Sequence, residues 1–177
     1  DLMWKDFVVV KGDNVDPFDY AIIVATEDNT QIFLDGSSTP SATIDAGEFW
    51  DYSLTGGIGA PHYLRTDKRA YCYHFTGASQ DDEVGMSAIP QMDCTGSRYI
   101  EFSMFTQNTV NQTMNLIVPP EAEPTLEVNG VPYASVTGAI SNPVPGLAGW
   151  VAVALPNAAL QPNNIITSEG FFHAGFM

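Results

Sequence analysis

The chain has 177 residues, which is long enough to bury a sizeable core without help from a metal or a disulfide. Its 21 acidic and 6 basic residues give a net charge of −15, and no Lys or Arg follows Arg98. This charge argues against nucleic acid or an anionic membrane as a partner, because both require a basic patch. No apolar stretch of about 18 residues occurs, so we expect no direct insertion into a membrane.

Short apolar runs separated by Gly, Pro, Asn and Asp predict an all-β protein. The predicted strands, in chain order, span residues 7–10, 20–25, 31–34, 49–54, 70–75, 99–105, 113–118, 125–128, 150–155 and 171–176. The runs 20–25 and 150–155 are apolar at alternate and intervening positions, which predicts strands covered on both faces. The run 101–105 alternates, so Phe102 should face the core while Glu101 and Ser103 face solvent.

The second half of the sequence is a weak copy of the first. Residues 30–36, 47–52 and 64–71 resemble residues 124–130, 147–152 and 165–172, in that order. The copies carry Asp35-Gly36 and Asn129-Gly130, pairs that tolerate the positive φ of a tight hairpin turn, and they align Trp50 with Trp150. We therefore predict one module of two pseudo-repeated antiparallel β-sandwich-like halves packed together, approximately residues 1–94 and 95–177.

No motif in the sequence names a reaction. Gly-x-Ser-x-Gly, His-Glu-x-x-His, the P-loop and Gly-x-Gly-x-x-Gly are all absent, and the 3 histidines lack a zinc spacing. A glycosidase with paired carboxylates is an alternative, but nothing selects one pair. We predict that the protein is not an enzyme.

Two clusters of carboxylates occur in predicted loops, and calcium prefers such oxygen ligands. The cofactor that these clusters suggest is calcium, with solvated acidic loops as the alternative. The candidate ligands are Asp13, Asp16, Asp19, Asp81, Asp82 and Glu83.

Aromatic rings beside polar groups suggest a ligand site, in which rings and polar tips would hold a glycan. The candidates are Tyr52, Tyr63, Asn108 and the loop residue His62. The alternative is that these rings pack in the core. Cys72 and Cys94 could form a disulfide that closes a loop of about 23 residues and contributes roughly 3 kcal/mol; otherwise Cys72 is a small core residue.

Several segments resemble the IgGFc-binding protein N-terminal domain family. Residues 18–30, with Ala25-Thr26-Glu27-Asp28-Asn29-Thr30, resemble its "ATEDNT" strand, and Ile44-Asp45-Ala46-Gly47-Glu48 resembles its "L-N-A-G-E" segment. Residues 65–73, 85–90, 145–151 and 168–171 resemble its "S-D-K-P-V", "M-S-x-x-P-P", "P-G-H-S-G-W" and "S-D-G-F" elements. The resemblance covers nearly the whole chain in order.

The resemblance implies a β-rich, extracellular module of a larger secreted or cell-surface protein, as in adhesins. We expect a non-catalytic adhesion or recognition module that binds a surface protein or a glycan receptor through its loops, stiffened by calcium. The alternatives are a carbohydrate-binding module that uses exposed aromatic rings, and a structural spacer domain of an adhesin. The resemblance provides no catalytic residues.

Overall fold

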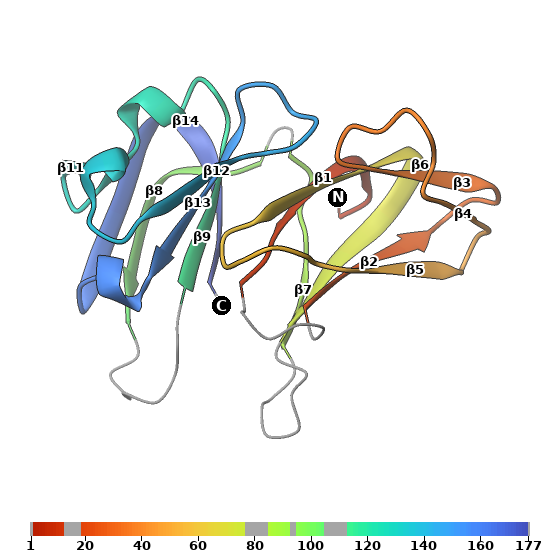
Figure 1. Cartoon of the computed structure of the whole chain (residues 1–177), viewed down its shortest axis with the longest axis horizontal. Helices are drawn as coiled ribbons and strands as arrows, with labels where there is room; N and C mark the ends of the chain where they lie inside the picture. Colours follow the sequence, from red (N-terminus) through yellow and green to blue (C-terminus); the bar gives the residue numbers. More distant parts are fainter. Residues whose placement is uncertain (1, 13–18, 77–84, 93–94, 105–112, 177) are drawn as a thin grey trace. The chain divides into compact units, whose positions relative to one another are not determined.

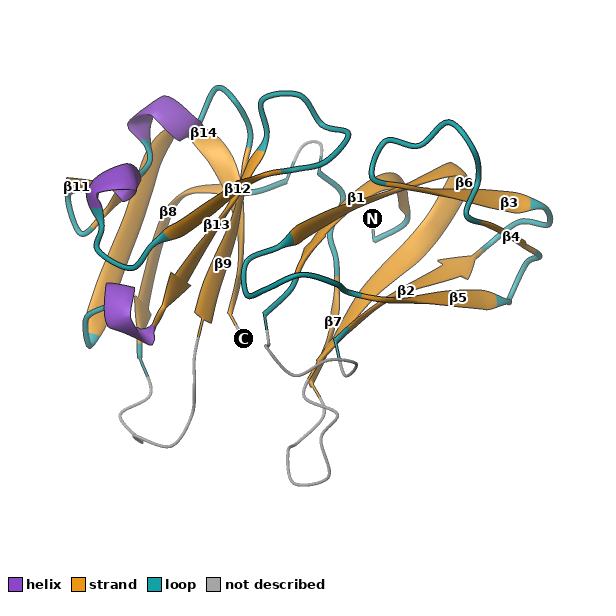
Figure 2. Ribbon diagram, in the orientation of Figure 1, coloured by secondary structure: helices purple, strands orange, loops and turns teal. Residues whose placement is uncertain are grey.

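The computed structural model describes residues 2–12, 19–76, 85–92, 95–104 and 113–176. The described residues form strands and three short 3₁₀ helices, η1 (Glu123–Thr125), η2 (Tyr133–Ser135) and η3 (Asn157–Ala159). The chain divides into two compact units: residues 1–94 with 144–148, and residues 95–143 with 149–177. The prediction of an all-β protein with two sandwich-like halves is confirmed (Figure 2).

Unit 1 is a seven-stranded antiparallel sheet in the order β4-β3-β6-β2-β5, with β1 and β7 also paired to β6 (Figure 1). The longest strand, β6, pairs with β1 and β3 through its first half and with β2 and β7 through its second half. It therefore links the two layers of a sandwich. The strands are β1 (Trp4–Val10), β2 (Tyr20–Ala25), β3 (Thr30–Leu34), β4 (Ala42–Ile44), β5 (Phe49–Ser53), β6 (Pro61–Thr76) and β7 (Gly85–Ala88).

The core of unit 1 lies between these layers and takes side chains from both. Phe7 of β1, Ile23 of β2 and Ile32 of β3 are each completely buried, as are Leu64 and Ala70 of β6. At about 25 cal/mol per Å² of apolar surface, each large side chain buried here contributes roughly 1.5–3 kcal/mol. Burial of these residues holds the two layers of the unit together.

Unit 2 repeats most of this topology, with β12 added at one edge and no counterpart of β7 among its described residues. Its strands follow the order β11-β10-β14-β9-β13-β12, with β8 also paired to β14. The long strand β14 pairs with β8 and β10 through its first half and with β9 through its second half. The strands are β8 (Ser97–Ser103), β9 (Thr113–Val118), β10 (Glu127–Val128), β11 (Val131–Pro132), β12 (Ile140–Pro143), β13 (Val151–Pro156) and β14 (Asn163–Phe176).

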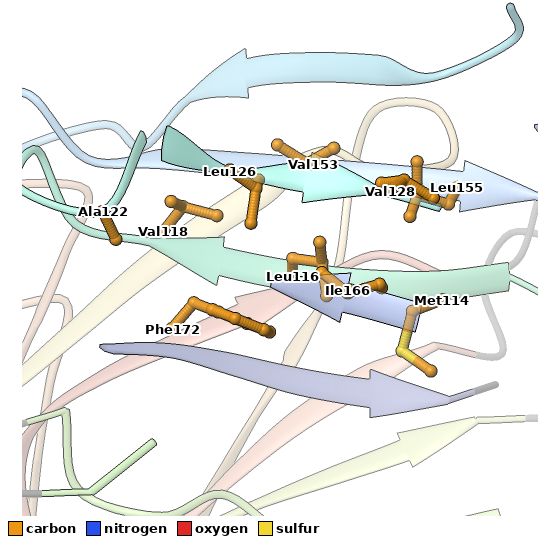
Figure 3. Packing of buried hydrophobic residues seen from close by; sticks show 10 residues of the cluster. All are labelled: Met114, Leu116, Val118, Ala122, Leu126, Val128, Val153, Leu155, Ile166 and Phe172. Atoms are coloured by element: carbon orange, nitrogen blue, oxygen red, sulfur yellow. The ribbon is translucent and has the colours of Figure 1, made fainter. Parts of the chain in front are cut away.

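The core of unit 2 is formed by side chains from the strands and from the segment that precedes η1. Figure 3 shows Phe172 of β14 and Leu126 among the aliphatic residues of β9 and β13. The cluster consists of Met114, Leu116, Val118, Ala122, Leu126, Val128, Val153, Leu155, Ile166 and Phe172.

The two predicted tight turns have the same geometry in both units. Asp35 and Asn129 adopt φ values of 51° and 54°. The Asp35 N–H donates to Tyr63 O at 2.7 Å, and its Oδ1 accepts from Tyr63 N–H at 2.9 Å. Asn129 makes the same two bonds with Ile165, each 2.8 Å long. Tyr63 and Ile165 are therefore equivalent residues.

This equivalence corrects the alignment of the sequence copies by one residue. The sequence comparison matched Leu64 with Ile165, whereas the bonds to the turns match Leu64 with Ile166, and both of these are fully buried. A shift of one residue exchanges the inner and outer faces of a strand. The weak similarity of the copies did not resolve this one-residue difference in alignment.

The match between Trp50 and Trp150 is also wrong. Trp50 pairs with Ile23 of β2. In unit 2 the strand equivalent to β2 is β9, where Leu116 takes the place of Ile23 and pairs with Val153, so Val153 is the equivalent of Trp50. Trp150 precedes β13. Of the two strands predicted to be covered on both faces, β13 is buried at four consecutive residues, whereas β2 is fully buried only at alternate residues.

Candidate functional site

Two of the predicted ligand residues, Tyr52 and His62, are in contact. Their rings meet edge to face with centroids 5.1 Å apart, and Trp50 stacks on Tyr52 at 5.7 Å. His62 Nδ1 lies 3.2 Å from Asp35 Oδ2 and 3.4 Å from the Tyr52 hydroxyl. The β3–β4 turn, β5 and β6 therefore converge on one imidazole.

His62 is 7% exposed, so its ring contacts other residues of the protein and offers little surface to a ligand. Its Nε2 lies 3.1 Å from Thr55 O and 3.3 Å from Thr55 N. Burial by itself lowers the pKa of His62, but the hydrogen bonds to Asp35 and Thr55 and the charge of Asp35 outweigh it, so the pKa is raised overall. The nearby charge of Lys11 opposes this rise.

The structure does not bring all four predicted ligand residues together. Tyr63 follows His62 in β6 and points to the opposite face, where its hydroxyl donates a short hydrogen bond to Asp6. Burial, followed by the bond to Asp6, raises the pKa of Tyr63. Asn108 lies outside the described residues.

Only one of the predicted calcium ligands falls in the described part of the chain. Asp19 is fully buried, where it makes a short bond to His74 Nε2 and accepts from Gly12 N–H at 3.0 Å. The others, Asp13, Asp16, Asp81, Asp82 and Glu83, lie outside it. Within the described ranges, no three His, Cys, Asp or Glu side chains are grouped so as to hold a metal ion. The calcium site stays a prediction.

The thiol of Cys72 is buried in the core of unit 1, and the structure shows it as free. Burial raises its pKa and so suppresses the reactive thiolate. Cys94 lies outside the described residues, so the disulfide stays a prediction.

The family-like segments of unit 1 meet around the turn between β2 and β3. Asn29 has a positive φ of 56°, and its N–H donates to Asp45 Oδ1 at 2.8 Å. Gln31 N–H donates to Asp67 Oδ1, also at 2.8 Å. Two carboxylates from separate family-like segments, Asp45 and Asp67, thus accept bonds from backbone donors at and just after this turn. These motifs maintain the fold of the turn.

The Ser168-Glu169-Gly170 segment likewise holds neighbouring backbone in place in unit 2. Ser168 Oγ donates to Ala122 O at 2.8 Å and accepts from Gly170 N–H at 3.1 Å. Thr125 Oγ1 accepts from Glu169 N–H at 2.9 Å. A side chain at Gly170 would meet the backbone of Ala122, so this position requires glycine.

The outer face of β8, β14 and β10 carries an exposed group of side chains that sequence reasoning did not select. Thr167 pairs with Tyr99 on one side and Glu127 on the other, and Ile165 pairs with Glu101. Cross-strand partners lie on the same face. We call Tyr99, Glu101, Glu127, Ile165 and Thr167 the β8–β14 face. The predicted outward position of Glu101 already implied, by the period of two, that Tyr99 points outward.

Tyr99 and Ile165 are 52% and 40% exposed, and the Tyr99 hydroxyl donates to Glu101 at 2.9 Å. The equivalent face of unit 1 is different, because its rings are buried: Tyr63 is 7% and Phe33 is 8% exposed. There, Tyr63 donates to Asp6, and the Arg65 guanidinium lies 4.2 Å above the Phe33 ring. Among the described residues, aromatic and aliphatic surface is thus exposed on this face in unit 2 and not in unit 1.

No described helix is long and apolar enough to cross a membrane.

Comparison with known proteins identifies the family. Neither a curated protein nor a solved structure matches the chain significantly. The family model for IgGFc binding protein, a family of extracellular binding domains, matches residues 4–176. The chain therefore belongs to the IgGFc binding protein family.

Proposed function

We propose that the chain is a non-catalytic recognition module of a larger secreted or cell-surface protein, and that it binds a protein partner through the β8–β14 face. The observation that carries the proposal is the exposure of Tyr99 and Ile165 on a sheet face whose counterpart in unit 1 has its rings buried. Tyrosine is enriched at protein interfaces because its ring is apolar and its hydroxyl is polar.

The surroundings of this face favour a basic partner. Glu101 and Glu127 lie on the face itself, and the chain has no Lys or Arg after Arg98. The Arg98 guanidinium lies 4.4 Å above the Phe171 ring, which is itself 52% exposed. An apolar patch bordered by carboxylates complements an apolar patch bordered by Lys or Arg. The partner is therefore a protein with such a surface.

The proposal is tested with immobilised chain and three probes: the Fc fragment of immunoglobulin G, a panel of secreted proteins with basic surfaces, and a glycan array. The double variant Tyr99→Ala, Ile165→Ala should weaken protein binding by at least about tenfold, since truncating interface anchors typically costs 1–2 kcal/mol or more. Binding should also weaken as salt is added.

Phe49→Ala is the matched control, because Phe49 is 65% exposed on β5 of unit 1. It should leave binding unchanged. Protein binding that survives the double variant would exclude this face. Binding to glycans alone would support the carbohydrate-binding module, and no binding to any probe would support the spacer; either result overturns the proposal. Turnover of chromogenic glycosides would contradict the non-catalytic assignment.

A further inference from the structure

We propose that His62 is a proton-operated switch that exchanges its hydrogen-bond partner between the two backbone groups of Thr55, in the glycine-rich loop 54–60. The geometry that points to this role is the approach of both backbone groups of one residue to one ring nitrogen. His62 Nε2 is 3.1 Å from Thr55 O and 3.3 Å from Thr55 N.

A single ring nitrogen cannot bond both groups in the same state. When the imidazole is protonated, Nε2–H donates to Thr55 O. When it is neutral, with its proton on Nδ1, Nε2 accepts from Thr55 N–H. Asp35 Oδ2, 3.2 Å from Nδ1, is an acceptor that holds the remaining proton on Nδ1 in the neutral state. The gain or loss of one proton therefore changes which of the two backbone groups of Thr55, its C=O or its N–H, is bonded to the ring.

The loop that carries Thr55 is anchored on both sides of this residue. Leu54, at its start, is fully buried and fixed by a 2.8 Å bond from its N–H to Asp19 O. Gly56 and Gly59 have φ values of 88° and 80°, a region that glycine reaches without strain. The far end of the loop is held by a bond from Gly59 N–H to Lys11 O at 2.7 Å and one from Lys11 N–H to Ala60 O at 2.8 Å, so the exchange is local to Thr55.

The charged and titratable groups around the ring come from three elements. Asp35 approaches from the β3–β4 turn and Tyr52 from β5. Lys11, which follows β1, is fully buried and acts on His62 through its charge. Burial lowers the pKa of His62, but the bonds to Asp35 and Thr55 together with the charge of Asp35 outweigh it, so the pKa lies above the ordinary histidine value of 6.5. The exchange therefore takes place at a higher pH than the titration of an ordinary histidine.

Unit 2 has the same arrangement without a titratable group. There, Asn129 replaces Asp35 and donates from Nδ2 to Asn164 Oδ1 at 3.1 Å, and Asn164 is the equivalent of His62. Asn164 is also fixed by bonds to Gln161 O at 2.6 Å and from Gln161 N–H at 2.9 Å. The second unit therefore provides a pH-independent version of the same contact.

The test is an NMR titration of the whole chain between pH 5 and pH 9. The amides of Thr55 and Gly56 should shift with the same midpoint as the His62 ring, above 6.5. Hydrogen exchange at the Thr55 amide, corrected for the intrinsic rate, should slow by about fivefold as pH rises through that midpoint, because its N–H gains an acceptor. A flat Thr55 amide across the His62 midpoint overturns the proposal.

The double variant Asp35→Asn, His62→Asn copies the pair found in unit 2 and should abolish the Thr55 transition. His173→Gln, a control in unit 2, should leave it intact. A Thr55 transition that persists in the double variant overturns the proposal. If that variant does not fold, the midpoints in the unmodified chain still decide the question.

Discussion

Gly170 offers the sharpest test of the packing in unit 2. A Cβ atom added at this residue would lie 2.7 Å from both Cα and Cβ of Ala122 and 2.9 Å from its backbone nitrogen. Such short contacts are essentially never observed, and the backbone atoms of Ala122 cannot rotate away. Ala122 is fully buried in the core cluster, so either the segment before η1 or strand β14 has to move.

Movement of either segment disturbs the bonds that join them. Ser168 Oγ donates to Ala122 O and accepts from Gly170 N–H, at 2.8 and 3.1 Å. We therefore expect Gly170→Ala to lower the free energy of unfolding by about 2–3 kcal/mol, near the upper end of the range for overpacking. For a chain of this length, that corresponds to a fall in Tm of roughly 4–12 °C.

Urea and thermal unfolding, followed by circular dichroism, measure this change. Gly175→Ala is the matched control, because Gly175 lies in the same strand with nothing within 4 Å of an added Cβ. It should leave stability unchanged or raise it by up to about 0.5 kcal/mol. Equal stability of the two variants would refute the close contact between β14 and Ala122.

Three further predictions concern titration, pairing and reactivity. The pKa of His62 is raised in the folded chain, so its contribution to stability is complete below the unfolded value of 6.5 and is lost as pH rises through the folded pKa. Urea unfolding across this pH range should show this loss of stability. In the variant His62→Asn, the pH dependence should disappear. Asn129→Asp should lower the free energy of unfolding by about 1–2 kcal/mol, since a carboxylate would face Asn164 Oδ1. Adding Asn164→His to this variant should restore stability, because it recreates the Asp–His pair of unit 1. A double variant that is no more stable than Asn129→Asp alone would contradict the equivalence of the two pairs. Burial raises the pKa of Cys72, so mass spectrometry should find it unalkylated in the native chain and alkylated after denaturation. Rapid native alkylation would contradict its burial, and absence of the thiol after denaturation would indicate a bridge to Cys94.

The local features of the fold could be predicted from the sequence. The Asp35-Gly36 and Asn129-Gly130 pairs predict turns with positive φ, and both turns have it. The alternation around Phe102 correctly gives its inward face. These predictions succeed because the backbone preferences of Gly and Asn, and the period of a strand, act over a few residues.

The long strands were only partly predictable. The sequence suggested a strand over residues 70–75, but β6 runs from Pro61 to Thr76. The polar residues 65–69 interrupt the apolar pattern at the place where β6 changes its pairing from β1 and β3 to β2. A strand that passes between two layers exposes different faces along its length, so no single alternation describes it.

The candidate site depends on contacts between distant parts of the sequence. His62 was a candidate because it was expected in a loop, whereas it lies in β6. Its bond to Asp35 spans 27 residues and could not be inferred from spacing. The β8–β14 face could be predicted only in part from the sequence, since the alternating pattern of β8 places Tyr99 on the outer face. Its significance appears only when the equivalent face of unit 1, with Tyr63 bonded to Asp6, can be compared with it.

Hydroxyl-radical footprinting of the chain, alone and with a bound partner, tests the proposed recognition face most directly. Tyr99 and Phe171 are each 52% exposed, while Phe49 and Met86 of unit 1 are 65% and 64% exposed, so all four should be oxidised in the free chain. We predict that the partner protects Tyr99 and leaves Phe49 and Met86 unchanged. Protection of Phe49 or Met86 with Tyr99 still oxidised would contradict the assignment of binding to unit 2.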